Sequence, residues 1–462
     1  MSQQQKNGNI IAIVTMFFLY AMISFVTNLG APIGVIWKSQ PEIGGSNVLG
    51  IMGNFMNFFA YLFMGIPAGN MLTKVGYKKT ALIGIGVGFF GVLIQFLSGF
   101  AAGIPGFCVY LLGAFVAGFS VCILNTVVNP MLNLLGGGGN RGNQLNMMGG
   151  TLNSLSGTMT PMLVGALIGQ VVTMNDVLEK KQIVVDGISR IATEADITQM
   201  SHVNLVMFIA MAVFACAFVI LTFIPIKDPE MGKVTADTKF EHSPWSFRHC
   251  LLGVIAIFVY VGVEVGIPGG LNFYLSDTTA NGAWVNPEAI VDAATIGGAV
   301  AAMYWLLMLV GRLVSSSIAG KISSRQLMLA TTMIGMVLIL AAILTPKSAT
   351  VTIPIVKILE WKIVMTTVPM SALFLILCGL CTSVMWASIF NLATEGLGKY
   401  TAKASGIFMM MVVGGGVLPV VQNFFADIMG YMPSYFIYLL AMAYMFYYAL
   451  IGCKNVNKDI PV

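Results

Sequence analysis

Twelve long apolar stretches run through this chain of 462 residues, and they constrain its fold more than any other feature. Each is long enough to cross the hydrocarbon core of a bilayer as an α-helix, which takes about 20 mostly apolar residues. Only 9% of the residues are charged, whereas soluble domains carry about a quarter. The sequence therefore predicts an all-α membrane protein with twelve transmembrane helices. We place these near residues 10–36, 48–72, 80–100, 105–134, 145–172, 203–225, 249–275, 292–318, 326–345, 364–393, 402–425 and 432–453.

The distribution of Lys and Arg predicts the orientation of these spans. With the N-terminus inside, sixteen of the 23 basic residues fall in segments on the inner side of the membrane. This bias satisfies the positive-inside rule and predicts that both termini are cytoplasmic. The polar start of the chain lacks the features of a cleaved signal peptide, so we expect the first span to be retained. Because the basic residues are scattered along the expected membrane edges, the net charge of +5 does not indicate nucleic-acid binding.

The spans divide six and six around the longest predicted cytoplasmic segment. We expect a first six-helix bundle over residues 1–225, a central loop over 226–248 and a second bundle over 249–462. An internal repeat supports two related halves, because the GFSVCILNTVVNPMLNLLG stretch of span four recurs as GLCTSVMWASIFNLATEGLG in span ten. Such pseudo-symmetry is typical of transporters that bind their substrate between the halves. The outer segment 173–202 is mixed in charge and is expected to form a solvated cap or a flexible loop.

One acidic residue, Glu264, lies near the middle of a predicted span. A carboxylate at that depth is costly, so it usually faces a polar cavity, pairs with a cation or binds a proton. Gly266, Pro268, Gly269 and Gly270 follow it, and we expect them to interrupt the helix beside a cavity. No basic residue is expected at mid-span, so we predict that Glu264 has no structural partner and serves function instead.

Amide side chains recur in the other spans. Amides donate and accept hydrogen bonds, which suits a neutral polyhydroxylated ligand, and an aromatic ring can cover the apolar face of a sugar. For any single Asn, however, hydrogen bonding between helices is the simpler explanation. Trp305 and Phe55 are further candidate aromatic platforms. The predicted substrate-binding residues are Asn28, Asn54, Asn57, Asn125, Asn129, Asn153, Glu264, Asn272, Trp386 and Asn423.

Residues for catalysis or metal binding are not arranged in any pattern we recognise. The three histidines fall in predicted loops or at helix ends, so neither a metal site nor a catalytic triad is indicated. The glycine run at residues 136–139 lacks the Lys-Ser/Thr ending and the preceding strand of a phosphate-binding loop. We therefore expect no enzyme activity, no cofactor and no metal.

Several motifs together carry a resemblance to a known family. GNMLTKVGYKK (69–79) has the shape of the loop signature of the Major Facilitator Superfamily. With it stand FFLYAMISFVTNLGAP (17–32), LNTVVNPMLNLLG (124–136), YVGVEVG (260–266) and GRLVSSSIAG (311–320). Over most of its length the chain resembles the fucose:proton symporter family of that superfamily, which includes bacterial fucose and glucose/galactose transporters. The resemblance implies twelve helices in the bacterial inner membrane and cation-coupled sugar uptake by alternating access.

The chain also departs from that family at two positions. Where fucose-type members carry acids in spans one and four, this sequence has Asn28 and Asn125. Glu264 matches the acid typical of glucose/galactose-type members, which makes it the remaining candidate for coupling.

We therefore expect a monomeric secondary transporter that takes up a sugar or sugar derivative, coupled to a proton or to sodium. An uncoupled sugar facilitator, or a carrier of another small polar solute, is the alternative. A membrane-embedded enzyme or a receptor is disfavoured, since the spans hold no paired carboxylates and no appended signalling domain is evident.

Overall fold

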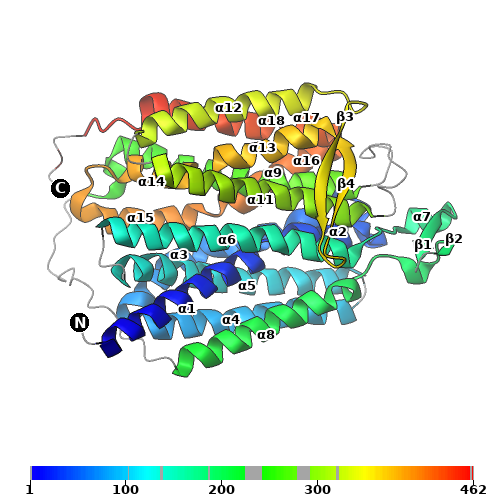
Figure 1. Cartoon of the computed structure of the whole chain (residues 1–462), viewed down its shortest axis with the longest axis horizontal. Helices are drawn as coiled ribbons and strands as arrows, with labels where there is room; N and C mark the ends of the chain where they lie inside the picture. Colours follow the sequence, from blue (N-terminus) through cyan, green and yellow to red (C-terminus); the bar gives the residue numbers. More distant parts are fainter. Residues whose placement is uncertain are drawn as a thin grey trace.

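The computed structural model describes residues 3–101, 103–135, 139–185, 188–223, 242–277, 292–318, 322–457 and 460. Long helices run side by side along one direction, and both chain termini lie at the same end of the molecule (Figure 1). We call that end the termini end. The opposite end carries two β-hairpins and is called the hairpin end.

The helices form two groups, which Figure 1 draws in colours from blue to green and from green to red. The first group consists of α1 (Gln3–Thr27), α2 (Gly30–Ser39), α3 (Asn47–Val75), α4 (Tyr77–Leu97), α5 (Gly103–Leu135), α6 (Gly139–Ile168) and α8 (Asn204–Phe223). The second consists of α9 (Arg248–Ser276), α11 (Ala293–Ile318), α12 (Ser324–Leu344), α13 (Met370–Thr382), α14 (Met385–Thr394), α15 (Thr401–Met411), α16 (Gly414–Met429), α17 (Tyr431–Ser434) and α18 (Phe436–Tyr447). The groups meet where α6 packs on α11 and where α3 packs on α15 and α16. The predicted loop 226–248 lies mostly outside the described residues, so the domain boundaries stay a prediction.

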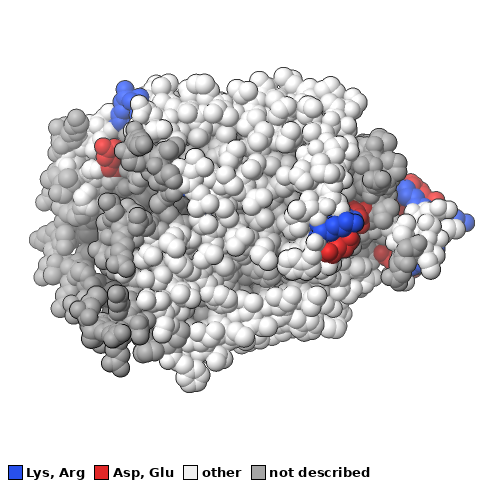
Figure 2. Space-filling view, viewed as in Figure 1, with Lys and Arg blue, Asp and Glu red and all other residues white. Residues whose placement is uncertain are grey.

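The described chain contains eleven helical segments that are long and apolar enough to cross a membrane. The remaining predicted span corresponds to α6, a helix of 30 residues whose first half is rich in Asn and Gly. Because α6 packs between α1 and α11, described polar side chains such as Asn153 and Ser154 face protein and not lipid. On the face seen in Figure 2, charged residues gather at the two ends and leave an uncharged band between them. These features confirm a helical multi-pass membrane protein.

The predicted helix break in the span of Glu264 is absent, and other spans are broken instead. The expectation of a break after Glu264 is wrong, because α9 is one continuous helix that contains Pro268. Pro268 has no N–H to donate to the carbonyl of residue 264, yet the surrounding helices keep α9 helical. Breaks occur instead in span one at residues 28–29, in span ten at 383–384 and in span eleven at 412–413.

Close packing at the hairpin end brings α6 and α11 into backbone contact. A Cβ at Gly298 would overlap the carbonyl oxygen of Pro161 and lie 3.2 Å from the Cα of Gly165. A Cβ at Gly165 would in turn overlap the carbonyl oxygen of Ala294. Glycine is therefore required on both helices, as at other close crossings of membrane helices.

Polar contacts also join the two groups at the hairpin end. Lys38, in the last turn of α2, forms an ion pair of 2.5 Å with Asp277, at the end of α9. The Tyr431 hydroxyl lies 2.8 Å from Asn47 Oδ1 and 2.7 Å from Asp277 Oδ2. Nearby, the Asp427 carboxylate accepts hydrogen bonds from both the backbone and side-chain nitrogens of Asn47, at 2.9 and 2.7 Å. An anion is favoured there, because it lies at the positive N-terminus of α3.

Two hairpins modify the all-α plan. Residues 173–202 fold into α7 (Met174–Leu178), the antiparallel pair β1 (Gln182–Val185) and β2 (Ile188–Ile191), and short 3₁₀ turns. The hydrogen-bonded guanidinium of Arg190 and the Thr193 hydroxyl hold the pKa of Asp196 well below its usual value. The second hairpin pairs β3 (Thr350–Lys357) with β4 (Lys362–Pro369). The prediction that residues 364–369 begin a membrane span is wrong, since β4 occupies them.

The glycine crossing predicts a position-specific loss of stability. Replacing Gly298 by Ala forces α6 and α11 apart, and overpacking of this kind costs about 1–3 kcal/mol. Gly86→Ala on α4 is the matched control, because a Cβ there meets nothing within 4 Å. We expect thermal unfolding in detergent at a lower temperature for Gly298→Ala only; equal midpoints for the two variants would contradict the crossing.

The ion pair at the hairpin end predicts a second effect. Asp277→Asn removes the charge partner of Lys38, so the two groups should separate more readily at this end. Asp176→Asn is the control, because Asp176 pairs with Lys181 at 2.6 Å within a single segment.

Spin labels at Glu42→Cys and Ile428→Cys would report on the two groups, with Cys108 and Cys216 changed to Ser because both are exposed. We expect the population of molecules with a longer distance between the two labels to grow about tenfold in Asp277→Asn. This corresponds to a change of about 1.4 kcal/mol in the equilibrium between the closed and separated arrangements of the two groups. Distance distributions that are identical in both variants would refute the role of the pair.

Candidate functional site

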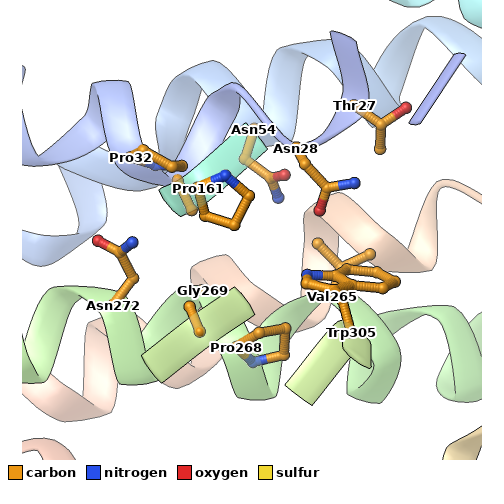
Figure 3. Close-up of a pocket in the computed structure, with 12 residues that line it drawn as sticks. Thr27, Asn28, Pro32, Asn54, Pro161, Val265, Pro268, Gly269, Asn272 and Trp305 are labelled. Carbon is orange, nitrogen blue, oxygen red and sulfur yellow. The ribbon is translucent and has the colours of Figure 1, made fainter. Parts of the chain in front are cut away.

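A hollow lies between the two helix groups near the middle of the molecule. It is narrow, because the space that can hold the centre of a water molecule amounts to about 20 Å³. Figure 3 shows side chains that point into it from both groups. The lining residues are Thr27, Asn28, Ala31, Pro32, Asn54, Pro161, Val265, Pro268, Gly269, Asn272, Ala301 and Trp305.

Asn28 reaches the hollow because the first span breaks at this residue. Pro32 cannot donate the backbone hydrogen bond that the carbonyl of residue 28 would normally receive, which favours the break. The amide nitrogen of Asn28 donates to Ser24 O at 2.9 Å and to Ser24 Oγ at 3.1 Å. Its carbonyl oxygen points into the hollow (Figure 3).

Asn54 joins the two groups at the edge of the hollow. It lies on α3, is buried, and donates from Nδ2 to the Gly415 carbonyl at 2.9 Å. Gly415 lies in the first turn of α16, directly after the break in span eleven. Residue 419, which would normally donate to this carbonyl, is proline, so the carbonyl is free to accept from a side chain of the other helix group.

Asn272 provides a buried hydrogen-bond donor that is unpaired within the described part of the chain. It lies on α9 and is 2% exposed. Its Oδ1 accepts a hydrogen bond from Ser276 Oγ at 3.4 Å, whereas Nδ2 has no partner among the described residues. An unsatisfied buried amide costs about 1–3 kcal/mol, so a ligand that accepts this hydrogen bond would gain that energy.

The remaining lining is mainly apolar. Trp305 lies on α11 and presents its indole ring to the hollow opposite Asn28 (Figure 3). Val265, Pro268 and Gly269 of α9 add apolar surface. None of the twelve lining residues carries a charge, so this hollow suits a neutral ligand with hydroxyl groups and one apolar face.

Glu264 lies beside the hollow, and the expectation that it has no partner is wrong. Its neighbour Val265 lines the hollow, while Glu264 Oε1 forms an ion pair of 3.3 Å with Arg312 Nη2. The Glu264 and Arg312 side chains are 14% and 22% exposed, so both charges are largely shielded from solvent. Arg312 lies six residues before the end of the predicted span 292–318, and its long side chain reaches Glu264.

Arg312 also contacts the other helix group. Its Nη1 donates to the Gly150 carbonyl at 2.9 Å and to Ser154 Oγ at 2.8 Å. One guanidinium therefore connects α9, α6 and α11. A charged pair at this depth is the arrangement expected where a membrane protein handles ions.

The other predicted residues lie outside the lining of the hollow. Asn125 donates to the Tyr61 hydroxyl at 2.7 Å, and Asn153 donates to the Tyr20 carbonyl at 3.3 Å. Asn129 accepts from the Tyr20 hydroxyl and donates to the Asn125 carbonyl at 2.9 Å. These amides hydrogen-bond to neighbouring protein, which was the alternative explanation for each of them.

The last three predicted residues contact protein in the same way. Asn57 donates to the Ala114 carbonyl at 3.5 Å, and Asn423 donates to the Pro419 carbonyl of its own helix at 2.8 Å. Trp386 packs against Tyr260, and the two ring centroids are 6.2 Å apart. Tyr260 lies one helical turn before Glu264. A direct role of these residues in substrate binding stays a prediction.

Within the described part of the chain, no three His, Cys, Asp or Glu residues are grouped closely enough to hold a metal ion. The lining residues that the sequence analysis missed include Pro161 and Ala301. Both are small or apolar, and nothing in their sequence context distinguishes them from packing residues. Pro161 could have been considered, because a proline within a membrane helix leaves a carbonyl free.

Comparisons with known proteins agree with this architecture. The chain is 27% identical over 454 residues to a glucose/galactose transporter of Brucella abortus, covering 98% of this chain and 97% of the relative. It is 22% identical over 433 residues to the L-fucose-proton symporter of Escherichia coli, covering 91% and 87%. Among solved structures, the transporter FucP in its outward conformation superposes with a TM-score of 0.64 at 19% identity, covering 97% of this chain and 100% of FucP.

A bacterial homologue of the human lysosomal transporter Spinster, in an inward-facing conformation, gives a TM-score of 0.61 at 12% identity and covers 98% of both chains. At these identities the two structures establish the fold alone. The sequence profile of the Major Facilitator Superfamily matches residues 10–419, and this chain therefore belongs to that superfamily.

Proposed function

We propose that this protein is a secondary active transporter that takes up a neutral sugar or sugar derivative by alternating access, coupled to a proton. The observation that carries the proposal is the uncharged hollow between the helix groups, lined by three amides and an indole, with a charged pair beside it. Relatives that are glucose/galactose transporters and an L-fucose-proton symporter support the same class of substrate.

Once the helix groups move apart enough to admit it, a pyranose would meet complementary contacts in the hollow. A sugar hydroxyl would accept the free hydrogen bond of Asn272 Nδ2 and donate to the Asn28 carbonyl oxygen. The Trp305 ring would cover the apolar face of the sugar. Because Asn54 already bridges to Gly415, a ligand that competes for its amide would also act on the contact between α3 and α16.

Glu264 and Arg312 are the proposed coupling pair. While the ion pair is formed, Arg312 favours the ionised carboxylate, since an adjacent cation stabilises an anion. Arg312 and Glu264 lie in the same helix group, so separation of the groups would first break the contacts of Arg312 with Gly150 and Ser154. If the Arg312 side chain freed in this way leaves Glu264, Glu264 becomes a buried carboxylate without a counter-ion and takes up a proton. Proton binding and opening of the α6–α11 contact are thereby linked through Arg312.

The same pair also favours the alternative of an uncoupled facilitator. If Arg312 keeps Glu264 ionised through the whole cycle, the acid carries no proton. The amides at Asn28 and Asn125 then leave no other carboxylate at the positions where fucose-type members have one. Substrate-induced alkalinisation of the medium in whole cells would exclude the facilitator.

We further propose that the termini end faces the cytoplasm of a bacterium, in its inner membrane, and that the monomer is the transporting unit. The excess of Lys and Arg in segments expected at that end supports this orientation through the positive-inside rule. The hollow is formed within a single chain, which supports a functional monomer.

Glu264→Gln tests coupling directly. Gln cannot carry a proton, so uphill accumulation of sugar in proteoliposomes with an imposed pH gradient should be abolished. Exchange of labelled for unlabelled sugar needs no net proton movement and should persist. The matched control is Glu360→Gln, the same change at an exposed carboxylate of the β3–β4 hairpin. Accumulation that survives in Glu264→Gln would show that this carboxylate does not couple transport.

Asn272→Ala tests the binding site. Loss of one hydrogen bond to a neutral sugar costs about 1.4 kcal/mol, so KM for uptake should rise about tenfold. Sugar-induced thermal stabilisation should weaken accordingly, in a screen run at two pH values with and without sodium. Asn129→Ala is the comparison, since both ends of that amide are occupied by Tyr20 and Asn125. An equal rise of KM in the two variants would argue against the hollow as the sugar site.

A further inference from the structure

The β3–β4 hairpin has apolar side chains on both of its faces. Successive residues of a strand point to opposite faces, so the pairs Pro354–Met365 and Val356–Ile363 share one face. Ile353, Ile355 and Val364 belong to the other face. A hairpin with one face on protein and one in water normally alternates apolar and polar residues. Here the first face carries the polar pair Thr352–Thr367 near the helices but is apolar toward the turn.

The inner face of the hairpin packs on the helices. Ile353, Ile355 and Val368 are buried, at 5%, 2% and 0% exposure. β3 packs on α11 and α6, so the hairpin crosses the line where the two helix groups meet (Figure 1). Near its turn, Lys357 pairs with Asp292 at 2.5 Å, directly before the start of α11. These contacts hold the hairpin against the bundle and fix which face points outward.

The outer face and the turn are exposed and apolar. Trp361 is 88% exposed, Ile363 70% and Met365 63%, and Leu359 and Val356 are also exposed. Soluble surfaces carry single apolar residues of this kind, but a contiguous group marks a contact with another apolar phase. The outer face therefore has an apolar partner that covers it.

The neighbouring helix identifies that partner. α12 leads directly into β3, and its outward residues Val337, Leu340 and Leu344 are exposed at 62%, 44% and 70%. In a membrane protein those side chains face lipid, and the outer face of the hairpin continues the same surface. Figure 2 shows most of this side of the molecule free of charge between the two ends.

The chemistry of the hairpin places it at the boundary of the bilayer and not in its core. A two-stranded sheet leaves backbone groups unpaired along both edges, and hydrocarbon cannot satisfy them. Trp residues are enriched at the membrane–water interface, as are Lys residues such as Lys362 that flank an apolar segment. We propose that the β3–β4 hairpin lies flat in the lipid headgroup region at the hairpin end, with Trp361, Ile363 and Met365 inserted among the acyl chains.

The β1–β2 hairpin provides a contrast at the same end. It projects beyond the bundle (Figure 1), and Lys181, Arg190 and Asp196 lie on or beside it. Ile188 of β2 is 68% exposed, close to the 70% of Ile363. A probe at each of these two positions therefore compares hairpins of equal exposure but different surroundings.

A quenching experiment on the full-length protein in liposomes tests the proposal. An environment-sensitive dye is attached at Ile363→Cys or Ile188→Cys, with Cys108 and Cys216 changed to Ser. We expect lipids that carry a nitroxide near the headgroup to quench the dye at position 363 several-fold more strongly than at 188. Aqueous iodide should show the reverse order.

Two results of this labelling experiment would overturn the proposal. Equal lipid quenching and equal iodide access at both positions would place the hairpin in water. Position 363 could instead be protected from both quenchers, with the protection lost when the protein is diluted in lipid. That result would assign the face to a second copy of this chain. Tryptophan fluorescence of the unlabelled protein gives an independent check. The emission of Trp361 is the part that is lost in Trp361→Phe, and brominated lipid should quench that part. Absence of this quenching would also refute insertion.

Discussion

The arrangement of the centre of this protein depends on one guanidinium. Arg312 contacts Glu264 of α9 and, through Gly150 and Ser154, the helix α6 of the other group. A carboxylate and a guanidinium are each costly at bilayer depth, and each makes the other tolerable. Removing either partner leaves an uncompensated charge, so the positions of α6, α9 and α11 are mutually constrained. The neutral hollow lies beside this pair, so the charged groups are separate from the residues that we propose as ligand contacts.

The fold could be predicted from the sequence because the lipid bilayer requires long apolar helices. Apolar length sets the number of spans, and the family resemblance agreed with the match over residues 10–419. The β3–β4 hairpin was missed because its strands are as apolar as the helices next to them, and residues 364–369 are therefore predicted as part of a span. The β1–β2 hairpin was missed for another reason, since the mixed charge of residues 173–202 predicts a solvated cap or loop. Hydropathy measures the preference for lipid and does not distinguish β4 from the start of α13.

The candidate site was predicted in part. Asn28, Asn54, Asn272 and Trp305 do line one hollow. Asn125, Asn129 and Asn153 instead bind Tyr61 and Tyr20, because an amide pattern on a helix does not specify which neighbour it will meet. The partner of Glu264 was missed for a geometric reason, since the reach of an Arg side chain and the tilt of its helix decide its depth. The break expected in α9 was assigned from composition, whereas the packing around Pro268 keeps that helix continuous.

The glycine crossing of α6 and α11 has a mechanical consequence. At Gly165 and Gly298 the two backbones touch and cannot approach further, so this point can serve as a fulcrum. Arg312 lies fourteen residues further along α11, a lever arm of about 21 Å at 1.5 Å per residue. A tilt of about 10° at the fulcrum would displace residue 312 by about 4 Å, more than the length of a hydrogen bond. A small angular movement between the helix groups is therefore amplified into an all-or-none change at the guanidinium, while the fulcrum itself hardly moves.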